Sequence, residues 1–112
     1  MKNSPSILNP SVMQELIGNE PDLIAQFKKD FIIQAQSSLK ELATHYNARD
    51  FEAIRQAAHF LKTSAKAIGA EQVTETLQQI EHAANAKDVN LTKQLIMQLK
   101  GSLQTLVKVI NS

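Results

Sequence analysis

Residues 51–70 read FEAIRQAAHFLKTSAKAIGA, and this stretch indicates the fold most clearly. Its apolar residues recur every three or four positions, at 51, 54, 58, 61, 65 and 68, which is typical of a helix with one face in a core. Asp50 is suited to cap the start of this helix, and Gly69 is suited to end it in a left-handed conformation. We therefore predict an amphipathic helix over residues 51–68.

Similar patterns on both sides of this stretch predict four more helices. A short helix is expected over residues 10–17, because Asn9 suits the N-cap, Pro10 suits the first helical position and Gly18 ends the pattern. Longer helices are expected over residues 21–46, between Gly69 and Asn85, and from Leu91 onward. Short connections make neighbouring helices antiparallel. The chain is therefore predicted to be all-α, an up-down-up-down antiparallel four-helix bundle with a short extra N-terminal helix.

Composition supports a helical domain and narrows the function. The three prolines all lie in the first 21 residues, and three glycines are too few for the turns of a β-sandwich or barrel. The length of 112 residues predicts a single domain over residues 1–112, in which residues 1–8 are expected to be loose. The absence of cysteine excludes disulfides, thiol nucleophiles and Cys-ligated zinc.

The charge balance and hydropathy exclude further classes of function. Lys and Arg number 12 against 11 Asp and Glu, which gives a net charge of +1 and no basic excess for nucleic-acid binding. The sequence contains neither an 18-residue apolar run nor a start that resembles a signal peptide. We therefore expect a cytoplasmic protein that binds neither nucleic acid nor membrane.

The histidine in the middle of residues 51–68 stands out. At 100° per residue, His59 projects roughly 130° from the centre of the apolar face and therefore points to water. Its neighbours one turn away are Arg55, Gln56, Lys62 and Thr63, and Lys66 follows on the same side. An imidazole in water is largely neutral at pH 7 and nucleophilic at one ring nitrogen, and the nearby cations favour a dianionic phosphoryl group. From position alone, the more common explanation is a solvated surface histidine.

A resemblance adds weight to this histidine. The segment HFLKTSAKAIG, from His59 to Gly69, resembles the signature of histidine phosphotransfer (HPt) domains, which reads His-x-Leu-Lys-Gly-Ser-x-x-x-x-Gly. The pair Ala57-Ala58 before the histidine and the place of this helix in the predicted bundle are also similar to the family. Thr63 departs from the pattern, because the family most often has glycine there to let a receiver domain approach closely. The resemblance covers nearly the whole chain.

The resemblance implies a function and a site. The protein would accept a phosphoryl group from a receiver-domain aspartate onto His59 and pass it to another receiver domain in a two-component phosphorelay. Lys62 would help to neutralise the phosphoryl group, and Glu81, 22 residues after the histidine on the next helix, would hydrogen-bond a ring nitrogen and fix the tautomer. The partner-binding surface would include Arg55, Gln56, Phe60, Thr63 and Lys66.

The same resemblance implies a phosphotransfer intermediate rather than an enzyme. Autokinase activity is not expected, because the sequence has no Gly-rich phosphate loop that would form an ATP site. No cofactor of its own is expected, since Mg²⁺ would be held by the partner receiver domain. The partners would be receiver domains of response regulators and hybrid histidine kinases, and a monomer would keep the site accessible. The initial Met and the complete bundle favour a free-standing protein over an excised domain.

The alternatives to phosphotransfer are a helical adaptor and a bundle enzyme with a metal centre. A helical adaptor would bind a signalling partner through the same face without phosphotransfer, and His59 would then be incidental. A bundle enzyme with a metal centre would need Glu-x-x-His pairs, which the sequence lacks. His45 suits the C-terminal turn of its helix, and His82 has no histidine partner at i+4 or i−4, so no metal site is expected.

Overall fold

The computed structural model describes residues 4–111, and within that range the chain is helical with no β-strand. The helices are α1 (Pro10–Ile17), α2 (Pro21–Asn47), α3 (Phe51–Ile68), α4 (Glu71–Asn85) and α5 (Val89–Asn111). The predicted all-α class is confirmed. Among these residues, no helix has the length and apolar character needed to cross a bilayer.

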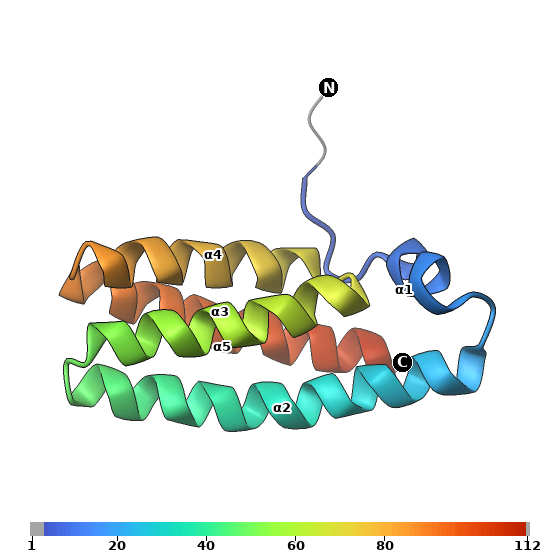
Figure 1. Ribbon diagram of the computed structural model, residues 1–112, viewed down its shortest axis with the longest axis horizontal. Coiled ribbons are helices and arrows are strands. Elements are labelled where there is room, and N and C mark those ends of the chain that lie inside the picture. The colour runs from blue at the N-terminus through green and yellow to red at the C-terminus, as the bar shows by residue number, and fades with distance from the viewer. Residues whose placement is uncertain (1–3, 112) are drawn as a thin grey trace.

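The four long helices form an up-down-up-down bundle, as predicted (Figure 1). Helices α2, α3, α4 and α5 follow one another antiparallel, and α5 returns to pack against α2. Helices α3 and α5 lie diagonally opposite each other, and the core separates their backbones. The short α1 lies at the end of the bundle where α3 ends and α2 begins, and it packs against both. This topology leaves the outer face of α3 open to solvent, between α4 on one side and α2 on the other.

The core is filled from the apolar faces that the sequence pattern predicted. The largest fully buried side chains come from all four long helices, namely Leu42, Ile54, Leu61, Val73, Leu77, Ile80, Thr92, Leu99 and Leu106. Phe27 of α2 is 43% exposed, and the buried face of this helix begins one turn later at Phe31. The extra turns of α2 extend beyond the bundle end and pack there only in part.

The turns before α3 and α5 are built alike. Both read Asn-Ala-cation-Asp, and the cation, Arg49 or Lys87, has a left-handed φ of 56°. The next residue, Asp50 or Asp88, closes the preceding helix through its N–H and caps the next helix through its carboxylate. Because Asp88 caps in this way, α5 begins at Val89 rather than at the predicted Leu91.

The segment before α1 is attached to the bundle, which differs from the loose segment expected over residues 1–8. Residues 1–3 lie outside the described residues. From Pro5 onward the chain crosses the turn between α3 and α4, where the Gln72 N–H donates to the Ser6 carbonyl at 2.9 Å and the Asn9 N–H donates to the Gly69 carbonyl at 2.8 Å. Ile7 and Leu8 pack against the core. Local sequence patterns could not predict these hydrogen bonds, because they join residues at least 60 positions apart.

Candidate functional site

His59 lies in the middle of α3 on the face that points away from the core. Its side chain is 61% exposed, as the helical spacing predicted. Ala58 and Leu61, which lie before and after His59 on the core face of the same helix, are fully buried. The backbone that carries the imidazole is therefore held by core packing, while the ring itself stands in solvent.

Glu81 of α4 orients the imidazole. Its Oε1 lies 3.2 Å from His59 Nδ1, and its side chain is 14% exposed. A carboxylate only accepts hydrogen bonds, so this contact places the proton on Nδ1 and leaves the lone pair on Nε2. Burial alone would raise the pKa of Glu81, but the hydrogen bonds and charges of Lys62 and His59 outweigh it and hold that pKa below its ordinary value.

Lys62 is bound to the same carboxylate. Its Nζ lies 2.8 Å from Glu81 Oε2 and donates to Gln78 Oε1 at 2.6 Å. The Lys62 side chain is 14% exposed, so its stem packs along α4 and its ammonium group is held beside the imidazole. The structure therefore joins His59, Glu81 and Lys62 into one charged cluster that spans α3 and α4.

Gln78 is a member of this cluster that the sequence did not reveal. It lies one turn before Glu81 on α4, accepts from Lys62, and its Nε2 lies 2.9 Å from His82 Nε2. Its spacing could have indicated that it belongs to the site, because a residue three positions before Glu81 lies on the same face of the helix. His82 is thus occupied by an amide contact, and residues 4–111 contain no group of three metal-ligating side chains.

Arg55 is engaged differently from what the sequence suggested. It was expected to favour a phosphoryl group at His59, but its guanidinium pairs with Glu52 at 2.6 Å and 3.0 Å. Gln56 donates to the same carboxylate at 3.0 Å. The hydrogen bond from Arg55, followed by that from Gln56, lowers the pKa of Glu52 to about 2. The positive charge nearest the imidazole therefore comes from Lys62.

Open hollows flank His59 on two sides. One is lined by Arg55, Gln56, Phe60, Thr63 and Ser64, and it contains most of the predicted partner-binding surface. Phe60 is 68% exposed there, so it is not a core residue. Thr63 donates to the His59 carbonyl at 3.3 Å and borders both hollows.

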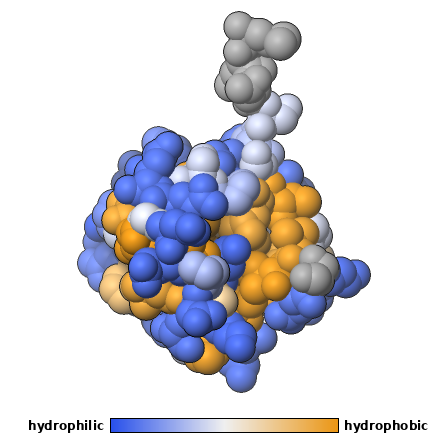
Figure 2. Space-filling model, turned by 90° about the vertical axis from the view of Figure 1, so that its right-hand side faces the viewer, coloured by the Kyte–Doolittle hydropathy of each residue, from blue (hydrophilic) through white to orange (hydrophobic). Residues whose placement is uncertain are grey.

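The second hollow is formed with α1, which the sequence analysis did not connect with the site. Val12, Glu15 and Leu16 of α1 face Lys62 and Lys66 of α3 across it. Leu16 is 62% exposed. Figure 2 shows apolar side chains gathered on this end of the bundle, and Leu16, Leu23, Phe27 and Val109 are among the exposed apolar residues of α1, α2 and α5 there. An exposed apolar surface ringed by charge is typical of a docking site.

The arrangement can perform one kind of chemistry. An exposed nucleophilic nitrogen has a cation beside it and a carboxylate behind it to stabilise positive charge on the ring. It can accept and release an electrophilic phosphoryl group that a partner delivers.

Comparisons with known proteins agree with this geometry. A family model of the Hpt domain matches residues 26–108. The crystal structure of histidine-containing phosphotransfer protein B (HptB) from Pseudomonas aeruginosa PAO1 has a similar fold, with a TM-score of 0.87 and 20% sequence identity over 96% of this chain and 94% of that chain. A search of curated proteins gave no match. Since the family model spans most of the chain, this protein belongs to the Hpt domain family and is a histidine phosphotransfer protein of a phosphorelay.

Proposed function

We propose that His59 is the phosphorylated residue, and that it takes the phosphoryl group from the aspartate of one receiver domain and gives it to the aspartate of another. The observation that carries this proposal is the contact between Glu81 Oε1 and His59 Nδ1 at 3.2 Å on an imidazole that is 61% exposed. An exposed ring with one nitrogen held by a carboxylate is suited to nucleophilic attack through the other nitrogen.

The transfer step follows from this tautomer. The Nε2 lone pair attacks the phosphorus of the aspartyl phosphate, the bond from phosphorus to the aspartate oxygen breaks, and the carboxylate leaves with the electron pair. The ring becomes a phosphorylated imidazolium with its proton on Nδ1, where Glu81 accepts the hydrogen bond. The reverse step returns the lone pair to Nε2 when a second receiver carboxylate attacks. Because no proton has to leave the ring, the step is readily reversible.

Lys62 supplies the positive charge that this chain brings to the phosphoryl group. Its ammonium group is already beside the ring through Glu81, so little side-chain freedom is lost when a dianion arrives. The receiver domain would supply Mg²⁺, and this chain would contribute no cofactor. Autokinase activity is not part of the proposal, because the sequence offers no Gly-rich loop for ATP.

The receiver would dock across the two hollows beside His59. Phe60, Gln56 and Thr63 would form one side of the contact surface, with Arg55 at its rim, and Leu16 of α1 and Lys66 the other. A patch of this kind is small, which suits a partner that must leave after each transfer. We propose that the protein acts as a monomer in the cytoplasm, where the receiver domains of response regulators and hybrid kinases are found.

The test is phosphoryl transfer from a phosphorylated receiver domain to the wild type, His59→Gln and His45→Gln. His45 lies in the last turn of α2, so it controls for the loss of any histidine. We expect acid-labile, alkali-stable phosphate on the wild type and on His45→Gln, and none on His59→Gln. If all three folded proteins bind receivers but none becomes labelled, the helical adaptor is the better explanation.

A further inference from the structure

Helix α1 packs on the bundle through Met13 and Ile17, and its hydrogen-bonded anchor lies before its first turn. Among its eight residues Met13 is the buried one, with 4% of its surface exposed. Before it, the Asn9 N–H donates to the Gly69 carbonyl at 2.8 Å, where the segment crosses the turn between α3 and α4. A short helix with so little buried surface depends on its anchoring contacts for a fixed orientation.

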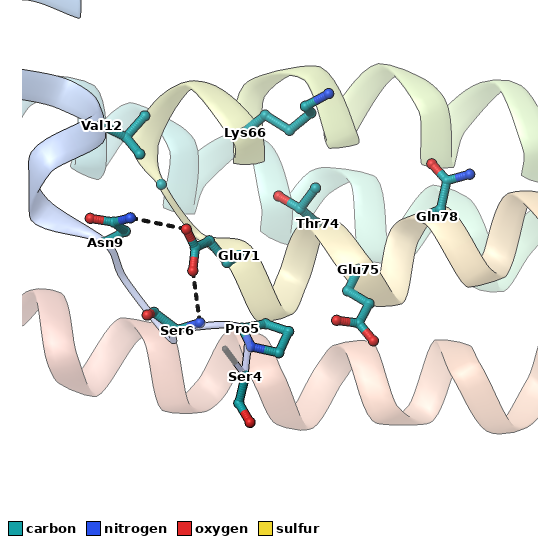
Figure 3. A pocket seen from close by; sticks show the side chains of 11 residues that line it. Ser4, Pro5, Ser6, Asn9, Val12, Lys66, Glu71, Thr74, Glu75 and Gln78 are labelled. Atoms are coloured by element: carbon teal, nitrogen blue, oxygen red, sulfur yellow. Dashed lines mark hydrogen bonds between the residues drawn. The ribbon is translucent and has the colours of Figure 1, made fainter. Parts of the chain in front are cut away.

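A single carboxylate forms much of this anchor (Figure 3). Glu71, the first residue of α4, accepts from the Ser6 N–H at 2.9 Å through Oε1 and from Asn9 Nδ2 at 3.0 Å through Oε2. The hydrogen bond from Asn9, followed by that from the Ser6 backbone, lowers the pKa of Glu71. We call the contacts of Glu71 with Ser6 and Asn9 the clasp.

The clasp and the start of α1 share the Asn9 side chain. While its amide nitrogen donates to Glu71, its Oδ1 accepts from Ser11 N at 3.1 Å and Ser11 Oγ at 2.8 Å and caps α1. The amide therefore cannot turn over without giving up one of these sets of bonds. The orientation of the cap, and with it the direction in which α1 leaves the turn, is fixed by the carboxylate.

Helix α1 also faces the proposed phosphorylation site, and Val12 borders both that site and the clasp. Val12 and Leu16 line the hollow that also contains His59 and Lys62. We propose that Glu71 is a positioning residue for receiver recognition, which holds α1 through Ser6 and Asn9 so that Val12 and Leu16 form one wall of the docking surface. This inference rests on the proposed function of His59 and the receiver contact described above.

If α1 is held less firmly, the affinity for the receiver domain changes, but the reactivity of the imidazole does not. If α1 occupies its docking position for only a fraction of the time, the apparent affinity for the receiver falls by that fraction. The cluster of His59, Glu81 and Lys62 is built by α3 and α4, so its geometry does not depend on α1. A small phosphoryl donor such as phosphoramidate needs no docking wall and reports on the nucleophile by itself.

The experiment compares the wild type with Glu71→Gln, using both a phosphorylated receiver domain and phosphoramidate as donors. In a glutamine an amide nitrogen replaces one of the two carboxylate oxygens, so a donor would face the N–H of either Ser6 or Asn9 and one bond of the clasp would be lost. We expect the receiver concentration at half-maximal rate to rise threefold or more, with the saturating rate and the phosphoramidate rate within twofold of the wild type. Glu75→Gln is the matched control, because Glu75 lies on the same helix and lines the same hollow as Glu71 (Figure 3), and its carboxylate has no hydrogen-bond or ion-pair partner among residues 4–111.

A second test asks whether the double variant of Asn9 and Glu71 restores the hydrogen bonds that the single variants lose. Asn9→Asp keeps the oxygen that caps Ser11 but turns a second carboxylate toward Glu71, so receiver recognition should weaken as in Glu71→Gln. In the double variant Asn9→Asp with Glu71→Gln, the new amide can donate to Asp and its oxygen can accept from Ser6. We expect the half-maximal receiver concentration of the double variant to return to within twofold of the wild type.

The outcomes separate this inference from the proposed function. An unchanged half-maximal concentration in Glu71→Gln, a double variant no better than Asn9→Asp, or an equal loss with phosphoramidate in a folded protein would overturn the positioning role. None of these results bears on His59, because His59→Gln tests the nucleophile with either donor. If His59→Gln still becomes phosphorylated, His59 is not the phosphorylated residue. The effect of Glu71→Gln on the half-maximal receiver concentration would then still decide the positioning role.

Discussion

The chemistry proposed for His59 depends on several neighbouring groups, and the local sequence predicts some of these better than others. Lys62 lies one turn away on the same helix, so the motif in α3 contains it. Glu81 could be suggested from its distance along the chain, because a helix hairpin with a short turn returns to the same level. The hydrogen bond of Gln78 with Lys62 and the pairing of Arg55 with Glu52 could not be predicted, because a surface side chain has several possible partners of similar energy.

Replacement of Glu81 tests how the ring is held. In Glu81→Gln the amide can accept from Nδ1–H or donate to Nδ1, so the tautomer is no longer fixed, and the charge that stabilises the phosphorylated ring is lost. We expect transfer from phosphoramidate to fall about fivefold to tenfold, which corresponds to about 1–1.4 kcal/mol. Nitrogen NMR of His59 should show a larger share of the tautomer with the proton on Nε2. An unchanged tautomer with an unchanged rate would remove Glu81 from the site.

At the scale of helices, the end of α3 requires a glycine at position 69 for two independent reasons. Gly69 has a φ of 79°, as the predicted left-handed cap requires. A Cβ at this position would also collide with the Asn9 carbonyl oxygen and touch Val12, because the segment before α1 crosses here. The first requirement could be predicted from the end of the apolar pattern. The second arises from a contact between distant residues, which no local pattern contains.

A pair of glycine substitutions should have opposite effects on stability. Gly69→Ala meets both a left-handed backbone and a collision, so it should destabilise the fold by at least about 2 kcal/mol. Gly101→Ala lies in the middle of α5, exposed and with open space around the new Cβ, and it should stabilise the fold by up to about 1 kcal/mol. Urea denaturation of the two variants checks both signs. A neutral Gly69→Ala would show that the crossing segment moves aside freely.

At the scale of the whole molecule, carboxylates tie together parts of the chain that the sequence separates. Glu81 joins α4 to α3, and Glu71 joins α4 to the segment before α1. The bundle topology was predictable from helix spacing and short turns, and Figure 1 agrees with it. The attachment of residues 5–9 was not predictable, because it depends on polar contacts between segments that lie far apart in the sequence.

These ties predict a dependence of stability on acid. The folded-state pKa of Glu81 and that of Glu71 lie below the ordinary value of 4.5, so the stabilisation is present above about pH 4.5 and is lost as the pH falls through the folded values. The urea midpoint should therefore fall between about pH 6 and about pH 3. In Glu81→Gln the fall should be smaller, because one of the titrating groups is absent. Equal falls in both proteins would contradict a role for Glu81 in the stability of the bundle.

The placement of His59 has a kinetic consequence. The imidazole stands on one convex face between two hollows, and both hollows adjoin the same ring. In the proposed docking, one receiver domain covers both hollows and blocks the approach of another, so donor and acceptor cannot be bound at once. Turnover must then alternate between two half-reactions, as in a double-displacement mechanism. Any receiver present in excess and lacking phosphate competes with the donor, so the direction of flux is set by the relative abundance of the partners.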